Sequence, residues 1–254
     1  MLEVRNLSKS YSGIPAVQNI SFVARAGEVT GYLGPNGSGK STTMKMLTGL
    51  IGASAGEVLF DGRRIADDLI SFRRRLGYVP EEPYLYTHLS GLEHLTMVAQ
   101  LHGIPRLKAR ERIDSLLQAF SLSEDREALI SSYSKGMRQK VLVAAALLHN
   151  PALIILDEPF SGLDIGSALI LRSLIEELGR RGKVVLFSSH ELETVERLCS
   201  HVVILHRGQV VADGSVESLR ALMSAPSLES IFAQLAVDQD SSVISRNLLD
   251  VIYA

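Results

Sequence analysis

The sequence has little of several features that would assign a protein to a class at once. Among its 254 residues there is one cysteine, Cys199, so no disulfide can form within the chain and nothing indicates a secreted, disulfide-held scaffold. The longest apolar run, Val141 to Leu148, is too short to span a bilayer. The first residues, MLEVRNLSKSYSG, do not show the basic and then apolar pattern of a signal peptide. Any role at a membrane would therefore need a partner chain.

Charge of one sign is not in excess either. The formal net charge is −2 and the sequence pI is about 6.4, so there is no basic footprint for nucleic acid. Hydrophobic residues make up 46% of the chain and the mean hydropathy is +0.17. Parallel sheets that are covered on both faces have this composition, because their strands are apolar throughout. The length suits one domain with a subdomain and is enough to bury a large core.

Short apolar runs that alternate with helical patterns predict a mostly parallel α/β sheet. We expect strands at 16–24, 28–34, 56–62, 76–80, 152–156, 183–189 and 201–205. A helix is expected at 41–50, directly after a glycine-rich loop. A second helix is indicated between the runs at 152–156 and 183–189, where leucine and isoleucine recur with the helical period at Leu171, Leu174, Ile175 and Leu178.

A helical insertion is expected to interrupt this sheet at about 87–149. It opens with Ser90, which has Glu93 three residues later, and this spacing is typical of a capping box. After the last parallel strand, Arg207 and Gly208 are expected to form the turn of a hairpin. A terminal helical pattern follows at Leu228, Ile231, Phe232 and Leu235, and the last residues are ambiguous between a docking helix and a frayed tail.

The strongest motif is GPNGSGKS, which fits the pattern G-x-x-x-x-G-K-[ST]. Its glycines let the backbone curl so that successive N–H groups point at phosphate oxygens, and the following helix N-terminus adds to the anion site. Lys40 can reach the β- and γ-phosphates, and the Ser41 hydroxyl can hold Mg²⁺. Alone, the motif predicts only a purine nucleoside triphosphate. The residues expected to bind it here are Gly34, Pro35, Asn36, Gly37, Ser38, Gly39, Lys40, Ser41 and Thr42.

Two acids end the apolar run LIILDEP. In parallel α/β sheets, ligands bind at the carboxyl ends of strands, so Asp157 is expected to orient the metal. Glu158 could then polarise an attacking water and accept its proton. His190 follows the next strand in the same way, and its position favours a γ-phosphate contact or a water-orienting role.

These motifs in this order resemble the nucleotide-binding subunit of an ATP-binding cassette (ABC) transporter. The resemblance covers the chain from Tyr11 to at least Gly214. It implies that Tyr11 stacks on adenine, that His190 is the switch histidine, and that SGLD, which ends at Asp164, lies across a dimer interface. The stretch YSKGMRQK is similar to the family signature, usually written L-S-G-G-Q, and supplies Ser134, Lys135 and Gly136.

The chain departs from the family pattern at four positions. Tyr133 stands for leucine, Lys135 for the first glycine and Met137 for glutamine of the signature. Glu81 stands where the family usually has a glutamine that contacts Mg²⁺ and the attacking water. A carboxylate can still bind the metal, so the expected metal ligands are Ser41, Glu81 and Asp157. The departures are similar to those of a subgroup of bacterial export-type subunits, whose permeases have about six helices.

The resemblance implies a P-loop NTPase-type core, with a mostly parallel sheet, an N-terminal antiparallel β part and an inserted helical subdomain. It implies an ATPase domain at 1–214 and a C-terminal helical extension at 215–254. It implies a homodimer or heterodimer in which each ATP, with Mg²⁺, lies between one subunit's phosphate loop and the other's signature. Lys40, Glu158 and His190 would be catalytic. A multi-pass permease would hold the dimer at the cytoplasmic face of the membrane, and nucleic acid is not an expected partner.

Other functions remain open from the sequence. An ABC-type ATPase without a membrane partner is the main alternative, although such chains usually have two cassettes or long insertions. A nucleotide-binding regulator that does not hydrolyse ATP would not need Glu158 and His190. A P-loop kinase or GTPase would have no reason to contain the signature and SGLD. The transported molecule is not indicated, since specificity in these systems lies in the membrane subunit.

Overall fold

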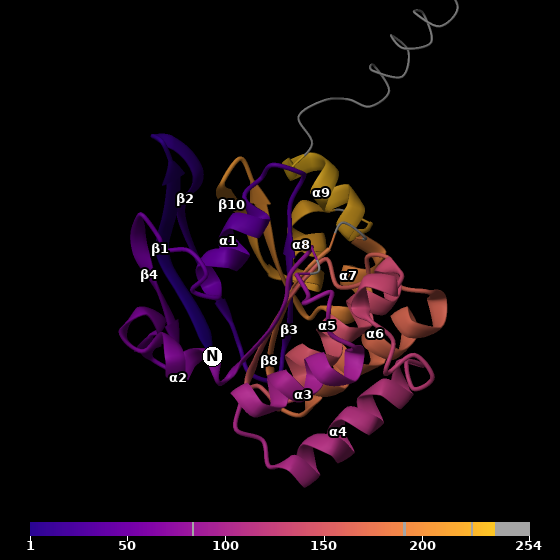
Figure 1. Cartoon of the computed structure of the whole chain (residues 1–254). Coiled ribbons are helices and arrows are strands. Elements are labelled where there is room, and N and C mark those ends of the chain that lie inside the picture. The colour runs from indigo at the N-terminus through magenta and orange to yellow at the C-terminus, as the bar shows by residue number, and fades with distance from the viewer. Residues whose placement is uncertain (83, 190–191, 225, 237–254) are drawn as a thin grey trace, which may run out of the picture.

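The computed structural model describes residues 1–82, 84–189, 192–224 and 226–236, and it is built on two sheets (Figure 1). The larger sheet has the strand order β10-β9-β3-β8-β7-β6. All neighbouring strands in it run parallel except β9 and β10. The bounds are β3 Val29–Leu33, β6 Leu76–Val79, β7 Leu153–Asp157, β8 Val184–Ser188, β9 His201–His206 and β10 Gln209–Ser215. The predicted mostly parallel α/β sheet is confirmed.

The smaller sheet is antiparallel, as predicted for the N-terminal part, and has the order β2-β1-β4-β5. Its strands are β1 Leu2–Tyr11, β2 Ile14–Ala24, β4 Ala55–Phe60 and β5 Arg63–Arg64. The sequence pattern does not indicate β1. Its buried residues Val4 and Leu7 are three apart, and the pairing with β2 shifts register between them. Such a bulge interrupts the period of two that marks a strand.

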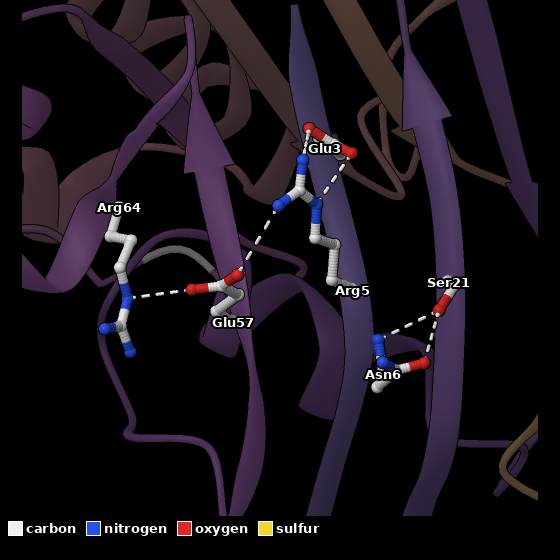
Figure 2. Close-up of polar contacts among 6 residues, drawn as sticks. All are labelled: Glu3, Arg5, Asn6, Ser21, Glu57 and Arg64. Carbon is white, nitrogen blue, oxygen red and sulfur yellow. Dashed lines mark hydrogen bonds and ion pairs between the residues drawn. The ribbon is translucent and has the colours of Figure 1, made fainter.

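The exposed face of the smaller sheet is held by ion pairs between adjacent strands, as Figure 2 shows. Arg5 Nε lies 2.7 Å from Glu3 Oε1 within β1, and Arg5 also lies 3.7 Å from Glu57 of β4. Glu57 in turn accepts from Arg64 Nε at 2.8 Å. Exposed pairs of this kind contribute about 0–1 kcal/mol each, so they help to fix strand pairing more than they stabilise the fold.

Helices cover the larger sheet and join its strands. Their bounds are α1 Lys40–Leu47, α2 Leu69–Arg73, α3 Gly91–Leu101, α4 Arg106–Ala119, α5 Lys135–Leu147, α6 Ile165–Arg180, α7 Leu192–Leu198, α8 Val216–Met223 and α9 Leu228–Ala236. In Figure 1, α3 and α4 project from the sheet on the side away from the smaller sheet. Within the described residues, no helix is long and apolar enough to cross a membrane.

Both faces of the larger sheet are buried, because alternate residues of each strand enter two separate cores. Ile154 and Leu156 of β7 belong to the core that also contains residues of α3 to α6. Leu153 and Ile155 belong to the other core, which α1 and the smaller sheet close. Full burial of such side chains contributes about 1.5–3 kcal/mol each. This arrangement explains why the strands are apolar runs rather than alternating ones.

The helices α3, α4 and α5 lie between β6 and β7, where the helical insertion is expected. The predicted capping box is confirmed, since the Ser90 hydroxyl accepts from the Glu93 N–H and the Glu93 carboxylate accepts from the Ser90 N–H. The stretch is not one helix, because Gly103 takes a left-handed φ of 67° and Pro105 precedes α4. The boundaries of the insertion stay a prediction.

The C-terminal part of the core is the predicted hairpin of β9 and β10. Its turn is formed by Arg207 and Gly208, whose φ values of 48° and 79° are both positive. Two positive φ values in a two-residue loop match the twist of the flanking strands. The helical pattern at 228–235 forms α9. The structure does not describe residues 237–254, which include the stretch at 243–254 that the sequence leaves ambiguous. The division at 214 stays a prediction.

Candidate active site

The phosphate-loop motif lies at the carboxyl end of β3, which is flanked by β8 and β9 in the larger sheet. Its backbone passes so close to its surroundings that side chains would not fit at two glycines. A Cβ at Gly34 would lie 2.4 Å from Ser38 Oγ, and one at Gly39 would lie 2.6 Å from the Ala16 carbonyl. Gly39 also has a φ of 104°, which L side chains rarely adopt. The glycine pattern is therefore required by packing as well as by the curl of the loop.

Lys40 points its amine back into this curl. Lys40 Nζ donates to the carbonyl of Gly34 at 2.6 Å and to that of Pro35 at 3.2 Å. Burial lowers the pKa of Lys40 from its ordinary value, and the nearby carboxylates, those of Glu158 and Asp157 first, oppose this lowering. The amine lies near the carboxylates of Glu158, Asp157 and Glu81 and at the start of α1. When an anion binds at this helix N-terminus, its oxygens can replace the two loop carbonyls as acceptors of the Lys40 hydrogen bonds.

The acidic pair lies where the sequence predicts it, at the carboxyl end of β7. Asp157 is 2% exposed and pairs in register with Ser188 of β8, whose hydroxyl donates to Asp157 Oδ1 at 2.5 Å. Burial raises the pKa of Asp157, and the bond from Ser188 opposes this effect. Ser188 is not singled out by the sequence analysis, and only the pairing of β7 with β8 identifies it.

Glu158 has a backbone conformation that non-glycine residues seldom take, with a φ of 49°. Its N–H donates to Ser188 Oγ at 3.0 Å, so one hydroxyl connects Glu158 to Asp157. Strained residues of this kind cost about 1–3 kcal/mol and gather at functional sites. The positive φ of Glu158 ends β7 directly after Asp157. The two carboxylates therefore lie in different backbone settings and can serve different roles.

Glu81 follows β6 and reaches the phosphate loop. The Ser41 hydroxyl at the start of α1 donates to Glu81 Oε2 at 3.3 Å. In the described part of the chain, no group of three or more His, Cys, Asp and Glu could hold a metal ion. The hydroxyl of Ser41 and the carboxylates of Glu81 and Asp157 are hard oxygen donors, which is the ligand chemistry that Mg²⁺ accepts when phosphates and waters complete its shell.

Tyr11 lies at the end of β1 with 48% of its surface exposed. It pairs with Ile14, and two residues further along β2 the carbonyl of Ala16 approaches Gly39. Tyr11 is therefore paired with β2, the strand whose Ala16 packs against the phosphate loop. Lys9 Nζ lies 5.3 Å from the centroid of the Tyr11 ring. The predicted switch residue, His190, lies outside the described residues.

The signature stretch forms the start of α5. The Ser134 hydroxyl caps this helix by accepting from the Met137 N–H at 3.2 Å, and both Ser134 and Lys135 are exposed. Tyr133, which replaces the usual leucine, is 4% exposed. Its hydroxyl donates to the Asp125 carbonyl at 2.7 Å. The helix N-terminus is thus presented at the surface while the preceding tyrosine anchors it to the core.

The loop from Glu158 to Asp164 packs against α5. It ends in SGLD, which the resemblance expects at a dimer interface, and the whole loop is called the dimer loop for that reason. Asp164 caps α6 by accepting from the N–H of Ser167 at 2.9 Å and from its hydroxyl at 2.7 Å. The nearly buried Lys140 lies 2.9 Å from Asp164 Oδ2. The Lys140 ammonium and the bonds from Ser167 hold the pKa of Asp164 well below its usual range. Lys140 is a further residue of this region that the sequence motifs do not identify by role.

Comparison with known proteins places these features in one family. The family model described as "ABC transporter" matches residues 17–161. The ABC-type transporter ATP-binding protein EcsA of Bacillus subtilis is 35% identical over 92% of this chain and 96% of its own length. NatA of the same organism, an ABC transporter ATP-binding protein, is 37% identical over 86% and 89%. The linearmycin resistance ATP-binding protein LnrL, also from B. subtilis, is 34% identical over 86% and 70%.

Solved structures agree with the sequence relatives. An ATP-binding subunit of an ABC transporter superposes with a TM-score of 0.88 at 37% identity, covering 92% of this chain and 99% of that one. The cassette MJ0796, solved as a dimer in a post-hydrolysis state with ADP and Pi, gives a TM-score of 0.78 at 26% identity, covering 85% and 98%. The chain belongs to the ABC transporter family as an ATP-binding subunit, and it is an ATPase.

Proposed function

We propose that this chain is the motor subunit of an ABC exporter, which dimerises on ATP and drives a separate multi-pass permease at the cytoplasmic face of the membrane. The observation that carries the proposal is the position of Ser134. It caps an exposed helix N-terminus, and its neighbours bond to the helical insertion and the dimer loop of the same chain. An exposed helix N-terminus is a suitable partner for the phosphates of a nucleotide carried by a second subunit.

The phosphate loop would bind ATP through its backbone N–H groups and through Lys40. Tyr11 would stack on the adenine, since aromatic faces are suited to a base. Ser41, Glu81 and Asp157 would hold Mg²⁺, which neutralises phosphate charge when it is bound with ATP. Glu81 has a carboxylate where an amide is usual in the family, and its contact with Ser41 keeps it in reach of this site.

Hydrolysis would use the carboxylate of Glu158 as the general base. A water attacks the γ-phosphorus, the bond from that phosphorus to the bridging oxygen breaks, and Glu158 accepts a proton from the water to leave ADP and phosphate. Lys40 would stabilise the charge on the transferring group. His190 is proposed to contact the γ-phosphate or orient the water.

The permease is proposed to dock beside the loop that follows β6. Tyr84 and Tyr86 are 75% and 56% exposed there, and Leu129, just before the signature, is 50% exposed. Tyr84 and Tyr86 follow Glu81 in the chain, and Leu129 precedes Ser134. A permease helix that packs against these side chains would therefore move with both segments. Export is supported by the relative LnrL, whose name assigns it to linearmycin resistance.

The proposal is tested by purifying the tagged chain from detergent-solubilised membranes of its own host. We expect a multi-pass membrane protein in stoichiometric amount, and we expect Tyr86→Glu to remove it. Leu107→Glu, at a residue on α4 that is 81% exposed, is the matched control and should retain the partner. Recovery of wild type in the soluble fraction with full ATPase activity and no membrane protein would favour a cassette ATPase without a permease.

The direction of transport needs a separate measurement. With the permease reconstituted in vesicles so that the cassettes face outward, an exporter moves its substrate into the lumen when ATP is added outside. Movement out of the lumen under the same conditions would reject export and leave the motor function standing.

A further inference from the structure

We propose that Lys135 is a positioning residue that ties the signature to the dimer loop of its own chain. In this role it does not bind the partner's phosphates. It makes α5 and the loop that carries Glu158 move together, so that a partner's ATP seated on the signature adjusts the base of the chain's own site. The inference rests on the proposed dimer, because only there does the signature meet a nucleotide.

The first observation is a direct contact. Lys135 Nζ donates to Ser161 Oγ at 3.0 Å, and Ser161 belongs to the dimer loop. The aliphatic part of Lys135 runs along the same loop, since a Cβ built on Gly162 would lie 3.2 Å from its Cγ and Cδ. Gly162 has a φ of 77°, which favours glycine and leaves this space for the lysine stem. The side chain is directed at its own chain along most of its length.

The second observation is that the backbones themselves meet at this point. A Cβ built on Gly136 would lie 2.5 Å from the Gly162 carbonyl oxygen. The first turn of α5 and the dimer loop are therefore in contact without any side chain between them. A movement of one of these segments toward the other is blocked, and a movement away would break the bond from Lys135.

Two further contacts fix the loop from the same helix. Gln139 Nε2 donates to the Pro159 carbonyl at 3.2 Å in a buried position. Lys140, which is 9% exposed, pairs with Asp164 at 2.9 Å. Residues 135 and 139 are four apart and share a face of α5. Contacts from α5 thus reach the start, the middle and the end of the loop, and Pro159 directly follows Glu158.

The three contacts differ in what a partner could alter. The side chains of Gln139 and Lys140 are buried, so a partner cannot contact them directly. Lys135 is exposed and lies in the first turn beside Ser134, which is the part that would face the partner's γ-phosphate. It is the contact whose strength depends on the seating of that ATP, and this makes it the point at which the two sites would be linked.

The test is a double-mutant cycle of Lys135→Met and Ser161→Ala in the full chain, with phosphate release and ATP binding both measured. We expect each single variant to lower kcat about three- to tenfold with KM unchanged, as for a lost positioning contact. The double variant should be no slower than the slower single variant, because both remove one bond. Lys135→Arg, which can still reach Ser161, should restore most of kcat. Lys108→Met, an exposed lysine of α4, is the control.

Two outcomes would overturn the inference. If Lys135→Met raises KM while Ser161→Ala has no effect, the ammonium acts on the partner's phosphates. If both variants slow hydrolysis but their effects multiply, the two residues act separately. Failure of the dimer itself is distinguishable: if Glu158→Gln does not dimerise with ATP, the proposed function and this inference both fail, whereas an ATP-dependent dimer with a multiplicative cycle rejects only the role of Lys135.

Discussion

The phosphate loop and the signature both face nucleotide in the proposed dimer, but they are built in opposite ways. The loop follows a central strand, and Gly34 and Ser38 within it are buried. The signature begins a helix at the surface, where Ser134 is exposed. The first region is complete within one chain, because its residues follow one another directly after β3. The signature presents the N–H groups at the start of α5 to the surface, and a ligand for them must come from another molecule.

The difference explains which departures from the family pattern the chain can accommodate. At the phosphate loop, any side chain at Gly34 or Gly39 would collide with backbone or with Ser38. At the signature, two of the three unusual residues make a contact of their own: Tyr133 bonds to the Asp125 carbonyl and Lys135 bonds to Ser161. Lys135 is accommodated because its position is exposed, and the buried Tyr133 is accommodated because its hydroxyl reaches a backbone carbonyl.

The largest expected effect is that of Glu158→Gln. We expect hydrolysis to slow by about 10²–10⁴-fold, the usual contribution of a general base, while ATP binding is retained and a stable dimer forms. Phosphate release and light scattering with and without Mg-ATP measure the two properties. Glu82→Gln, an exposed carboxylate after the same strand as Glu81, is the control. Full turnover in Glu158→Gln would show that another group is the base.

Ser134→Arg separates the two regions most directly. We expect hydrolysis to fall by about 10²-fold or more, because a bulky cation would block the helix N-terminus from the partner's γ-phosphate. ATP binding to the isolated chain should stay within about twofold of wild type, since the phosphate loop is untouched. Lys40→Ala should instead weaken that binding. If Ser134→Arg weakens it as much as Lys40→Ala, the signature contributes to its own chain's site and the comparison fails.

Asp157→Asn measures how much stability the nucleotide site loses by burying a carboxylate. Burial raises the pKa of Asp157, so the folded state holds its proton more tightly than the unfolded state and the ionised form costs stability near neutral pH. This cost is relieved as the pH falls through the raised pKa, and it is gone below the ordinary carboxyl pKa of about 4. Asp157→Asn should therefore melt a few degrees higher at pH 7 and equally with wild type at low pH, in calorimetry without nucleotide.

The same variant should lose Mg-dependent turnover. A gain in melting temperature together with a loss of activity would show that the buried carboxylate is retained for function at the expense of stability. A lower melting temperature at pH 7 would mean that the bond between Asp157 and Ser188 outweighs the burial of the charge.

The smallest expected effect is that of Tyr133→Phe. It removes the hydroxyl that donates to the Asp125 carbonyl, and we expect unfolding in urea to require about 0.5–1.5 kcal/mol less free energy. Hydrolysis should change little, because the ring remains packed. Tyr11→Phe, at an exposed ring, should leave stability within about 0.5 kcal/mol. A large loss of hydrolysis in Tyr133→Phe would mean that the bond from Tyr133 to the Asp125 carbonyl also positions the signature for catalysis.

Local sequence patterns predicted the elements in which residue type directly indicates burial or helix capping. The apolar runs became β3, β7, β8 and β9, and the Ser90 capping box starts α3. β1 was not predictable, because a bulge breaks its alternation. Ser188 was not predictable as part of the site either. A serine at a strand end is common, and only the pairing of β7 with β8 brings it to Asp157.

The phosphate loop, the acids at the end of β7 and the family can be recognised from the amino-acid sequence, because they depend on residue types at short, fixed spacings. The contacts of Lys135 and Asp164 become visible only in the folded chain. Lys135 reaches Ser161, 26 residues away, and Asp164 meets Lys140, 24 residues away, because α5 and the dimer loop meet in space. No local period encodes such contacts, since they arise only where the packing of α5 on the sheet brings it next to the loop that follows β7.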